Sequence, residues 1–244
     1  MASPEIIQTP DGQVLVKRFS LARRAEHVLA LVTFVALVVT GFPQKFDTSA
    51  FGHTVLGLLG GLENARLVHR LAGIVFTVHA AIHIAIFVLG GLSGRMRMTL
   101  LPVTKDVSDA WENLRYYMGH RKTPPDMPKF DYRQKFEYVG LVLGGLVMVF
   151  SGLVLMYPMA TASLVPASII PAAQVAHSNE AMLALLVLLI WHIYSAVLSP
   201  EVFPLDRSIL TGYITAEELE EHHAAEYKRL FPQGHGPRRG HGTH

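Results

Sequence analysis

The sequence lacks cysteine and has few charged residues for its length. Without cysteine the chain cannot form disulfides, attach a c-type haem covalently, use a thiolate nucleophile or ligate an iron–sulfur cluster. Only 16% of the 244 residues are charged and 50% are apolar, which argues against a single soluble domain and is typical of integral membrane proteins. The formal net charge of +2 is too small to indicate a nucleic-acid partner.

Four long apolar runs predict an all-α fold, a four-helix transmembrane bundle. At about 1.5 Å per residue these runs can cross roughly 30 Å of hydrocarbon, the first only narrowly. The first 24 residues lack the apolar core of a secretory signal peptide, so we expect the first span to direct targeting. The predicted spans are 25–42, 66–92, 134–157 and 174–198. They divide the chain into an arm (1–24), a four-helix membrane domain (25–200) and a tail (201–244).

The connecting segments carry weaker signals. We expect a short interfacial helix within 43–65, an amphipathic helix over 105–117 and a charged helix over 216–230. The Gly/His/Arg-rich end of the tail has a composition typical of disorder. No internal repeat is evident, although the second and fourth spans place their histidines similarly.

Basic residues predict the orientation of the chain in the membrane. Lys and Arg number four in the arm, nine in the loop 93–135 and five in the tail, whereas the first connection has two and the third none. By the positive-inside rule, both termini and the long loop are cytoplasmic. We therefore expect a multi-pass protein of a bacterial-type cytoplasmic membrane.

Histidines within the spans carry the strongest chemical signal, because ionisable groups are costly in hydrocarbon. His69 and His83 are 14 positions apart, and His177 and His192 are 15 apart. Each spacing keeps both imidazoles on one face of a helix, separated by roughly 21 Å. The second and fourth spans run in the same direction, so His69 is level with His177 near the outer surface and His83 with His192 near the inner one. Two facing imidazoles can bind one haem iron axially, so two levels would stack two b haems.

The inner level has a spare histidine. His27 begins the first span, so His192 could pair with either His27 or His83, and a third haem is conceivable. His79 is more simply explained as a hydrogen-bonding or packing group. Gly73, one turn after His69, lacks a Cβ and could let a flat porphyrin approach closely.

Basic residues beside these histidines are candidates for binding haem propionates by charge-assisted hydrogen bonds. An equally good explanation is that they mark the membrane edges. The candidates are Arg66 and Arg70 around His69, and Arg23 and Arg24 before His27.

Lys135 and Glu137 lie where the third span enters the membrane. These side chains could bind and protonate a quinone head group beside the inner haem, although interfacial anchoring is a simpler explanation for them.

Several motifs occur in a definite order along the chain. They are Arg23-Arg24-Ala25-Glu26-His27, Thr40-Gly41-Phe42-Pro43, the segment 65–73 around His69, and His192-Ile193-Tyr194. Together they resemble the four-helix cytochrome b subunits of respiratory formate dehydrogenases, nickel-iron hydrogenases and thiosulfate reductases. Segments 130–138, 177–181 and 203–215 resemble the cytochrome b/b6 domain branch, whose partners are periplasmic multihaem or molybdenum and iron–sulfur proteins.

The resemblance implies a set of haem ligands. The formate dehydrogenase pattern assigns the outer haem to His69 and His177, and the inner haem to His27 and His192. This sequence departs from that pattern by having His83 and by the spacing of 15 in the fourth span. The b6-type cytochromes, in which two helices bind both haems, would instead pair His83 with His192. We favour His27 as the partner of His192, because the sequence around His27 matches its motif, and keep His83 as the alternative or additional ligand.

These observations predict electron transfer across the membrane by b haems. The chain would connect a membrane quinone pool, menaquinone or ubiquinone, with an external redox subunit of iron–sulfur or multihaem type. It would be the electron-transfer subunit of a membrane oxidoreductase. The alternative is a histidine-lined metal-ion transporter, which would be expected to carry carboxylates within its spans. Glu26, Glu137 and Glu180 are instead predicted to lie near span ends.

Overall fold

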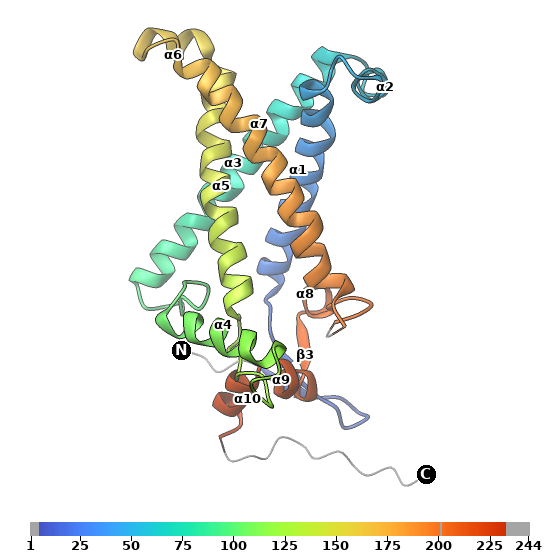
Figure 1. The fold of residues 1–244 in the computed structure, drawn as a ribbon, viewed down its shortest axis with the longest axis vertical. Coiled ribbons are helices and arrows are strands. Elements are labelled where there is room, and N and C mark those ends of the chain that lie inside the picture. Colours follow the sequence, from blue (N-terminus) through green and yellow to red (C-terminus); the bar gives the residue numbers. More distant parts are fainter. Residues whose placement is uncertain (1–4, 201, 233–244) are drawn as a thin grey trace.

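The computed structural model describes residues 5–200 and 202–232, and four long helices dominate it (Figure 1). All four are long and apolar enough to cross a membrane, as the sequence predicts. The fourth continues from an α-helix into two consecutive π-helical stretches. The spans are α1 (Leu21–Lys45), α3 (Leu62–Leu92), α5 (Tyr132–Met156) and α7 (Ile169–Val187) with η1 (Leu188–His192) and η2 (Tyr194–Leu198).

All four helices begin earlier than the hydropathy pattern predicts, by two to five residues. α1 begins at Leu21 because Ser20 caps it, accepting a hydrogen bond from the Arg23 backbone N–H. α7 begins at Ile169 instead of near residue 174. Consequently Glu180 lies well inside the fourth span, with its carboxylate against Gly144 of α5. The prediction that Glu180 lies near a span end is wrong.

The four spans associate as two helix pairs. α1 packs along α3 and α5 along α7, whereas contacts between the pairs are fewer. The side chains of the spans are largely exposed in the isolated chain, and the most apolar window of α3 has no buried residue. Lipid tails would cover such side chains in a membrane. Within α3 and α7 the buried residues are Ala65 and Ala173, which are equivalent small side chains near the start of each helix.

An internal repeat, which the sequence did not reveal to us, relates the two helix pairs. Arg18 and Lys129 are 111 positions apart, and each precedes a phenylalanine and then the capping residue of a long helix. Arg18 Nη2 donates to the Lys129 carbonyl at 3.1 Å, and Lys129 Nζ donates to the Arg18 carbonyl at 3.0 Å. The rings of Phe19 and Phe130 lie beside each other, 6.3 Å between centroids. Reciprocal contacts of this kind are those of a two-fold axis, here within one chain.

The same repeat extends through the membrane. Glu26 and Thr40 in α1 correspond to Glu137 and Ser151 in α5, again 111 positions apart. Ala65 and His69 in α3 correspond to Ala173 and His177 in α7. The equivalence would then pair His83 with His192, one position out of step. The π-helical turn η1 accounts for this shift, because a π turn holds one more residue than an α turn.

The ends of the bundle carry smaller elements. α2 (Ala50–Leu58) and α6 (Pro158–Leu164) lie at one end, and α2 confirms the helix expected within 43–65. At the other end, three short strands form an antiparallel sheet in the order β1-β2-β3, which an all-α prediction does not include. They are β1 (Ile6–Gln8), β2 (Val14–Lys17) and β3 (Tyr213–Thr215). The sheet joins the arm to the tail, since Val16 pairs with Ile214. We call this the sheet end.

Helices beside the sheet complete this layer. α4 (Thr104–Tyr117) confirms the predicted amphipathic helix. The short helix α8 (Ser208–Thr211) comes just before β3 in the chain. The predicted helix over 216–230 is instead two helices, α9 (Ala216–His222) and α10 (Ala224–Leu230). His223 breaks it: the side chain is buried and its Nδ1 bonds to the Pro128 carbonyl at 2.8 Å. Burial and the nearby Arg18 lower the pKa of His223 to about 4. The expected disorder of the Gly/His/Arg end falls on residues outside those described.

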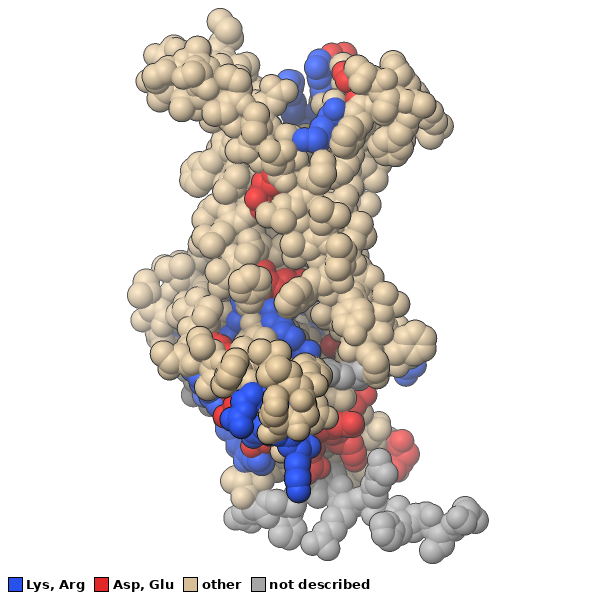
Figure 2. Space-filling view, viewed as in Figure 1, with Lys and Arg blue, Asp and Glu red and all other residues tan. Residues whose placement is uncertain are grey.

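Charge is distributed unevenly along the molecule (Figure 2). Lys, Arg, Asp and Glu gather at the sheet end and more sparsely at the opposite end, while the middle of the face shown is mostly uncharged, with a few acidic side chains. This is the surface expected of a protein that spans a bilayer.

Candidate functional site

Two pairs of histidines face each other between the helix pairs. The rings of His69 in α3 and His177 in α7 lie 6.2 Å apart between centroids, and those of His27 in α1 and His192 in η1 lie 6.1 Å apart. A metal–imidazole bond is about 2 Å, and the ring centre lies roughly 1 Å beyond the nitrogen, so one metal ion held between two imidazoles places their centres roughly 6 Å apart. Both pairs therefore fit axial ligation of one iron each. We call them the outer pair (His69 and His177) and the inner pair (His27 and His192).

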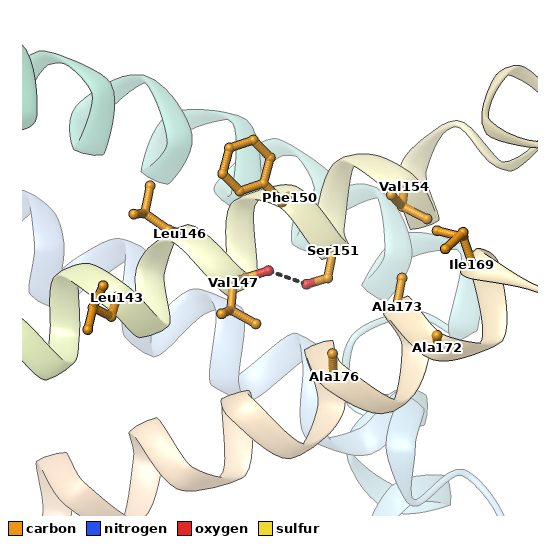
Figure 3. Close-up of a pocket in the computed structure, with 10 residues that line it drawn as sticks. All are labelled: Leu143, Leu146, Val147, Phe150, Ser151, Val154, Ile169, Ala172, Ala173 and Ala176. Carbon is orange, nitrogen blue, oxygen red and sulfur yellow. Dashed lines mark hydrogen bonds between the residues drawn. The ribbon is translucent and has the colours of Figure 1, made fainter. Parts of the chain in front are cut away.

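Hydroxyl groups on neighbouring helices orient the outer pair. Thr40 Oγ1 lies 3.0 Å from His69 Nδ1, and Ser151 Oγ lies 2.9 Å from His177 Nδ1. Each hydroxyl donates its own proton to a backbone carbonyl, Thr40 to Ala36 and Ser151 to Val147 (Figure 3). The hydroxyl oxygens must then accept from Nδ1–H, which leaves Nε2 of each imidazole as the free lone pair. This is the outer-shell support typical of metal-binding histidines.

Glycines next to these hydroxyl residues let the imidazoles approach. A Cβ on Gly41 would lie 2.9 Å from His69 Cε1, and a Cβ on Gly152 would lie 3.3 Å from His177 Cε1. Thr-Gly in α1 and Ser-Gly in α5 thus perform the same task at equivalent positions of the repeat. Beside Gly73, by contrast, a Cβ would meet only a Leu37 methyl at 4.0 Å. The helices leave room there, as expected for a site that admits a flat ring.

A carboxylate orients the inner pair. Glu137 Oε1 lies 2.6 Å from His192 Nδ1, and a carboxylate can only accept, so Nδ1 carries the proton and Nε2 is again free. Glu137, a candidate quinone ligand from sequence, is therefore already bonded to a candidate haem ligand. Lys135, the other quinone candidate, is buried and bonds to Asp106 of α4 at 2.7 Å.

His83 takes no part in the contact between the rings of His27 and His192. Its Nε2 is 3.1 Å from the Tyr138 hydroxyl, and its Nδ1 is 3.3 Å from Arg23 and 3.4 Å from Glu26. The ring that faces His192 is that of His27. His79, one turn earlier in α3, lies 6.5 Å from His83 between ring centroids.

The four arginines named from sequence differ in their partners. Arg23 pairs with Glu26 at 2.7 Å, Arg66 pairs with Glu63 at 2.9 Å, and Arg24 donates to the carbonyls of Ile209 and Leu210. Arg70, directly after His69, is exposed and forms no hydrogen bond or ion pair within the described ranges. It is the arginine freest to reach a ligand at the outer pair.

An apolar groove lies beside the outer pair, between α5 and α7 (Figure 3). Its volume is about 610 Å³, and of the residues that line it only Ser151 is polar. Ser151 therefore connects this groove with His177.

The histidines come in twos. In the part of the chain that the structure describes, no group of three or more His, Asp or Glu side chains could hold a metal ion. Four apolar helices with two pairs of facing imidazoles define a membrane cytochrome b. The sequence model of prokaryotic cytochrome b561 matches residues 18–212, and the chain belongs to that family. Among curated proteins none matches it. Membership of this family implies that the chain binds b haem and transfers electrons across the membrane.

Sequence reasoning missed the residues that hold the imidazoles. Thr40 and Ser151 lie one position before Gly41 and Gly152, and each lies 14 positions after a glutamate that contacts a histidine. That common spacing was the available signal, because it marks equivalent faces of α1 and α5.

Proposed function

We propose that the protein carries electrons between a membrane quinone pool and an external redox subunit through two b haems. The outer pair, His69 and His177, would hold one haem, and the inner pair, His27 and His192, the other. Bound iron supplies reversible one-electron chemistry. The observation that supports this most directly is the ring separation of 6.2 Å and 6.1 Å in the two pairs.

The chain's own residues would fix the haems and tune them. Thr40, Ser151 and Glu137 hold three of the four imidazoles by Nδ1, which orients Nε2 and raises its basicity. Glu137 is an anion, so it would stabilise the oxidised inner iron more than a hydroxyl would. We expect the inner haem to have the lower reduction potential for this reason. Arg70 and Arg66 are candidates for the outer propionates.

We further propose that the sheet end faces the cytoplasm, with both termini, and that the external subunit, of iron–sulfur or multihaem type, meets the end that carries α2 and α6. The excess of Lys and Arg in the arm, the long loop and the tail supports this orientation. His69 lies near the start of α3, which α2 contacts. The outer pair would then be the closer of the two to the external partner.

Haem content tests the proposal. Full-length protein, expressed with adequate haem and purified in detergent, should contain two b haems per chain in a pyridine haemochrome assay. His177→Ala and His192→Ala should each lower the content by one, whereas His83→Ala and the exposed His53→Ala should leave two. Folded wild-type protein without haem would contradict the proposal and favour the transporter.

A further inference from the structure

The internal repeat gives the inner pair a counterpart on the opposite side of the two-fold axis. Glu137 corresponds to Glu26 and His192 to His83, and His27 corresponds to Tyr138, 111 positions later. The structure brings these counterparts together in the same way. The rings of His83 and Tyr138 lie 6.0 Å apart between centroids, against 6.1 Å in the inner pair.

The two sites nevertheless differ in chemistry. His83 Nε2 and the Tyr138 hydroxyl are 3.1 Å apart and hydrogen-bonded to each other. One metal ion between two ligands requires two bonds of about 2 Å, so this pair is too close to hold iron. Tyrosine in place of histidine turns a metal-binding arrangement into a pair of hydrogen-bonding groups.

The counterpart site lies next to the inner pair. Glu26, which contacts His83, is the neighbour of His27 in α1, and Tyr138 is the neighbour of Glu137, which holds His192. Consecutive residues of a helix point about 100° apart, so the two sites occupy adjacent sectors of the bundle at one depth. A molecule bound at His83 and Tyr138 would be within short electron-transfer range of an inner haem.

Further polar and aromatic groups surround His83 and Tyr138. Arg23 and Glu26 reach His83 Nδ1 from the sheet end of α1. His79 has a buried Nε2 that finds no partner among the described residues. The ring of Phe87 lies 5.8 Å from that of Tyr138. Such ionisable groups within a span are costly, and the described helices alone give His79 no reason to be there.

We propose that His83 and Tyr138 bind the head group of a quinone, with His79 and Phe87 beside it. The inference rests on the proposed function and gives its quinone a place. A quinone becomes a quinol by gaining two electrons and two protons. The electrons would pass singly to or from the inner haem. His83 Nε2 and the Tyr138 hydroxyl would together bind one carbonyl oxygen and exchange its proton, and the proton of the opposite oxygen would be exchanged with water. The site lies between α3 and α5, which belong to different helix pairs, so an isoprenoid tail could leave towards lipid.

This site differs from the one that sequence suggested. Lys135 is committed to Asp106 and Glu137 to His192, so neither side chain is free to bind a quinone. His83 Nε2 and the Tyr138 hydroxyl, in contrast, bond to each other and can exchange that bond for bonds to a ligand.

Binding of a fluorescent quinone analogue, a hydroxyquinoline N-oxide, tests the inference. The full-length haem-containing protein in detergent is titrated with the analogue, and fluorescence quenching gives its Kd. We expect His83→Leu to weaken binding about tenfold or more and Tyr138→Phe about fivefold, because each removes a hydrogen bond to the ligand. His53→Leu and Tyr157→Phe, exposed residues at the opposite end, should bind as the wild type does.

Haem content measured on the same samples separates this inference from the proposed function. If wild type and both variants contain two haems and bind the analogue equally, the inference is overturned and the proposed function stands. Loss of a haem from His83→Leu, or a haem-loaded wild type that binds no analogue, would also overturn it. Absence of haem from folded wild type would overturn both.

Discussion

A single hydrogen atom on each of two glycines determines how closely the outer imidazoles approach α1 and α5. Gly41 is the more sensitive, because a Cβ there would lie 2.9 Å from His69 Cε1, closer than side-chain carbons approach such atoms. The Thr40 hydroxyl next to it fixes the same ring, so the imidazole cannot turn away without losing that bond.

Gly41→Ala should therefore displace His69 and lower haem content from two to about one, with the inner haem retained. Outer-shell disturbance of this kind is typically worth 10–100-fold in metal affinity. The measurement is haem per chain, together with the spectrum of the remaining haem. Gly57→Ala is the matched control, since its Cβ would enter open space. Unchanged haem content in Gly41→Ala would contradict the assigned contact.

At the scale of elements, the π-helical turn η1 explains why the two histidines of the fourth span are 15 positions apart, whereas those of the second span are 14 apart. If η1 absorbs one extra residue, removing that residue should restore an α-helix and leave His192 facing His27. Ile190 is 70% exposed, so its removal costs little packing.

Deletion of Ile190 should accordingly retain two haems. Deletion of Val78 from α3, which has no π turn, should rotate one half of that helix by about 100° relative to the other and abolish the outer pair. The measurements that check these two predictions are the haem content and the thermal stability of the two purified deletion variants. Loss of the inner haem on deletion of Ile190 would show that the π turn positions His192 in a way an α-helix cannot.

The helices and strands also show how much of the structure could be predicted from the sequence. The spans were predictable because twenty or so apolar residues have few other uses, and the level-matched histidines followed from helical geometry. Which imidazole faces His192 was harder to predict, because His27 and His83 share a depth and one sequence does not show how the helices are rotated about their axes. Only the motif around His27 favoured it, and the ring that faces His192 is that of His27. The strands were too short to recognise, and the pairing of Val16 with Ile214 joins distant segments. The repeat was hidden because its offset falls from 111 positions in α1 and α5 to 108 in α3 and α7, and η1 then shifts it by one more.

At the scale of the molecule, the orientation of the chain in the membrane can be tested by labelling introduced cysteines, because the chain has no cysteine of its own. A single introduced cysteine is then the only thiol that a membrane-impermeant maleimide can label. We expect Ser163→Cys in α6 to be labelled on intact spheroplasts and Ser108→Cys in α4 only after lysis; both residues are exposed. The reverse pattern would place the termini outside.

The outer pair lies on the internal two-fold axis, since His69 and His177 are equivalent residues of the repeat. The axis passes between them, and each helix hairpin supplies one ligand. Such a site has the geometry of a symmetric homodimer whose two subunits have been fused into one polypeptide. A cofactor at that position would bind both hairpins at once, so its loss would weaken the association of the two hairpins. The inner sites lie off the axis and occur twice, so one could diverge while the other, in the proposed function, would hold iron.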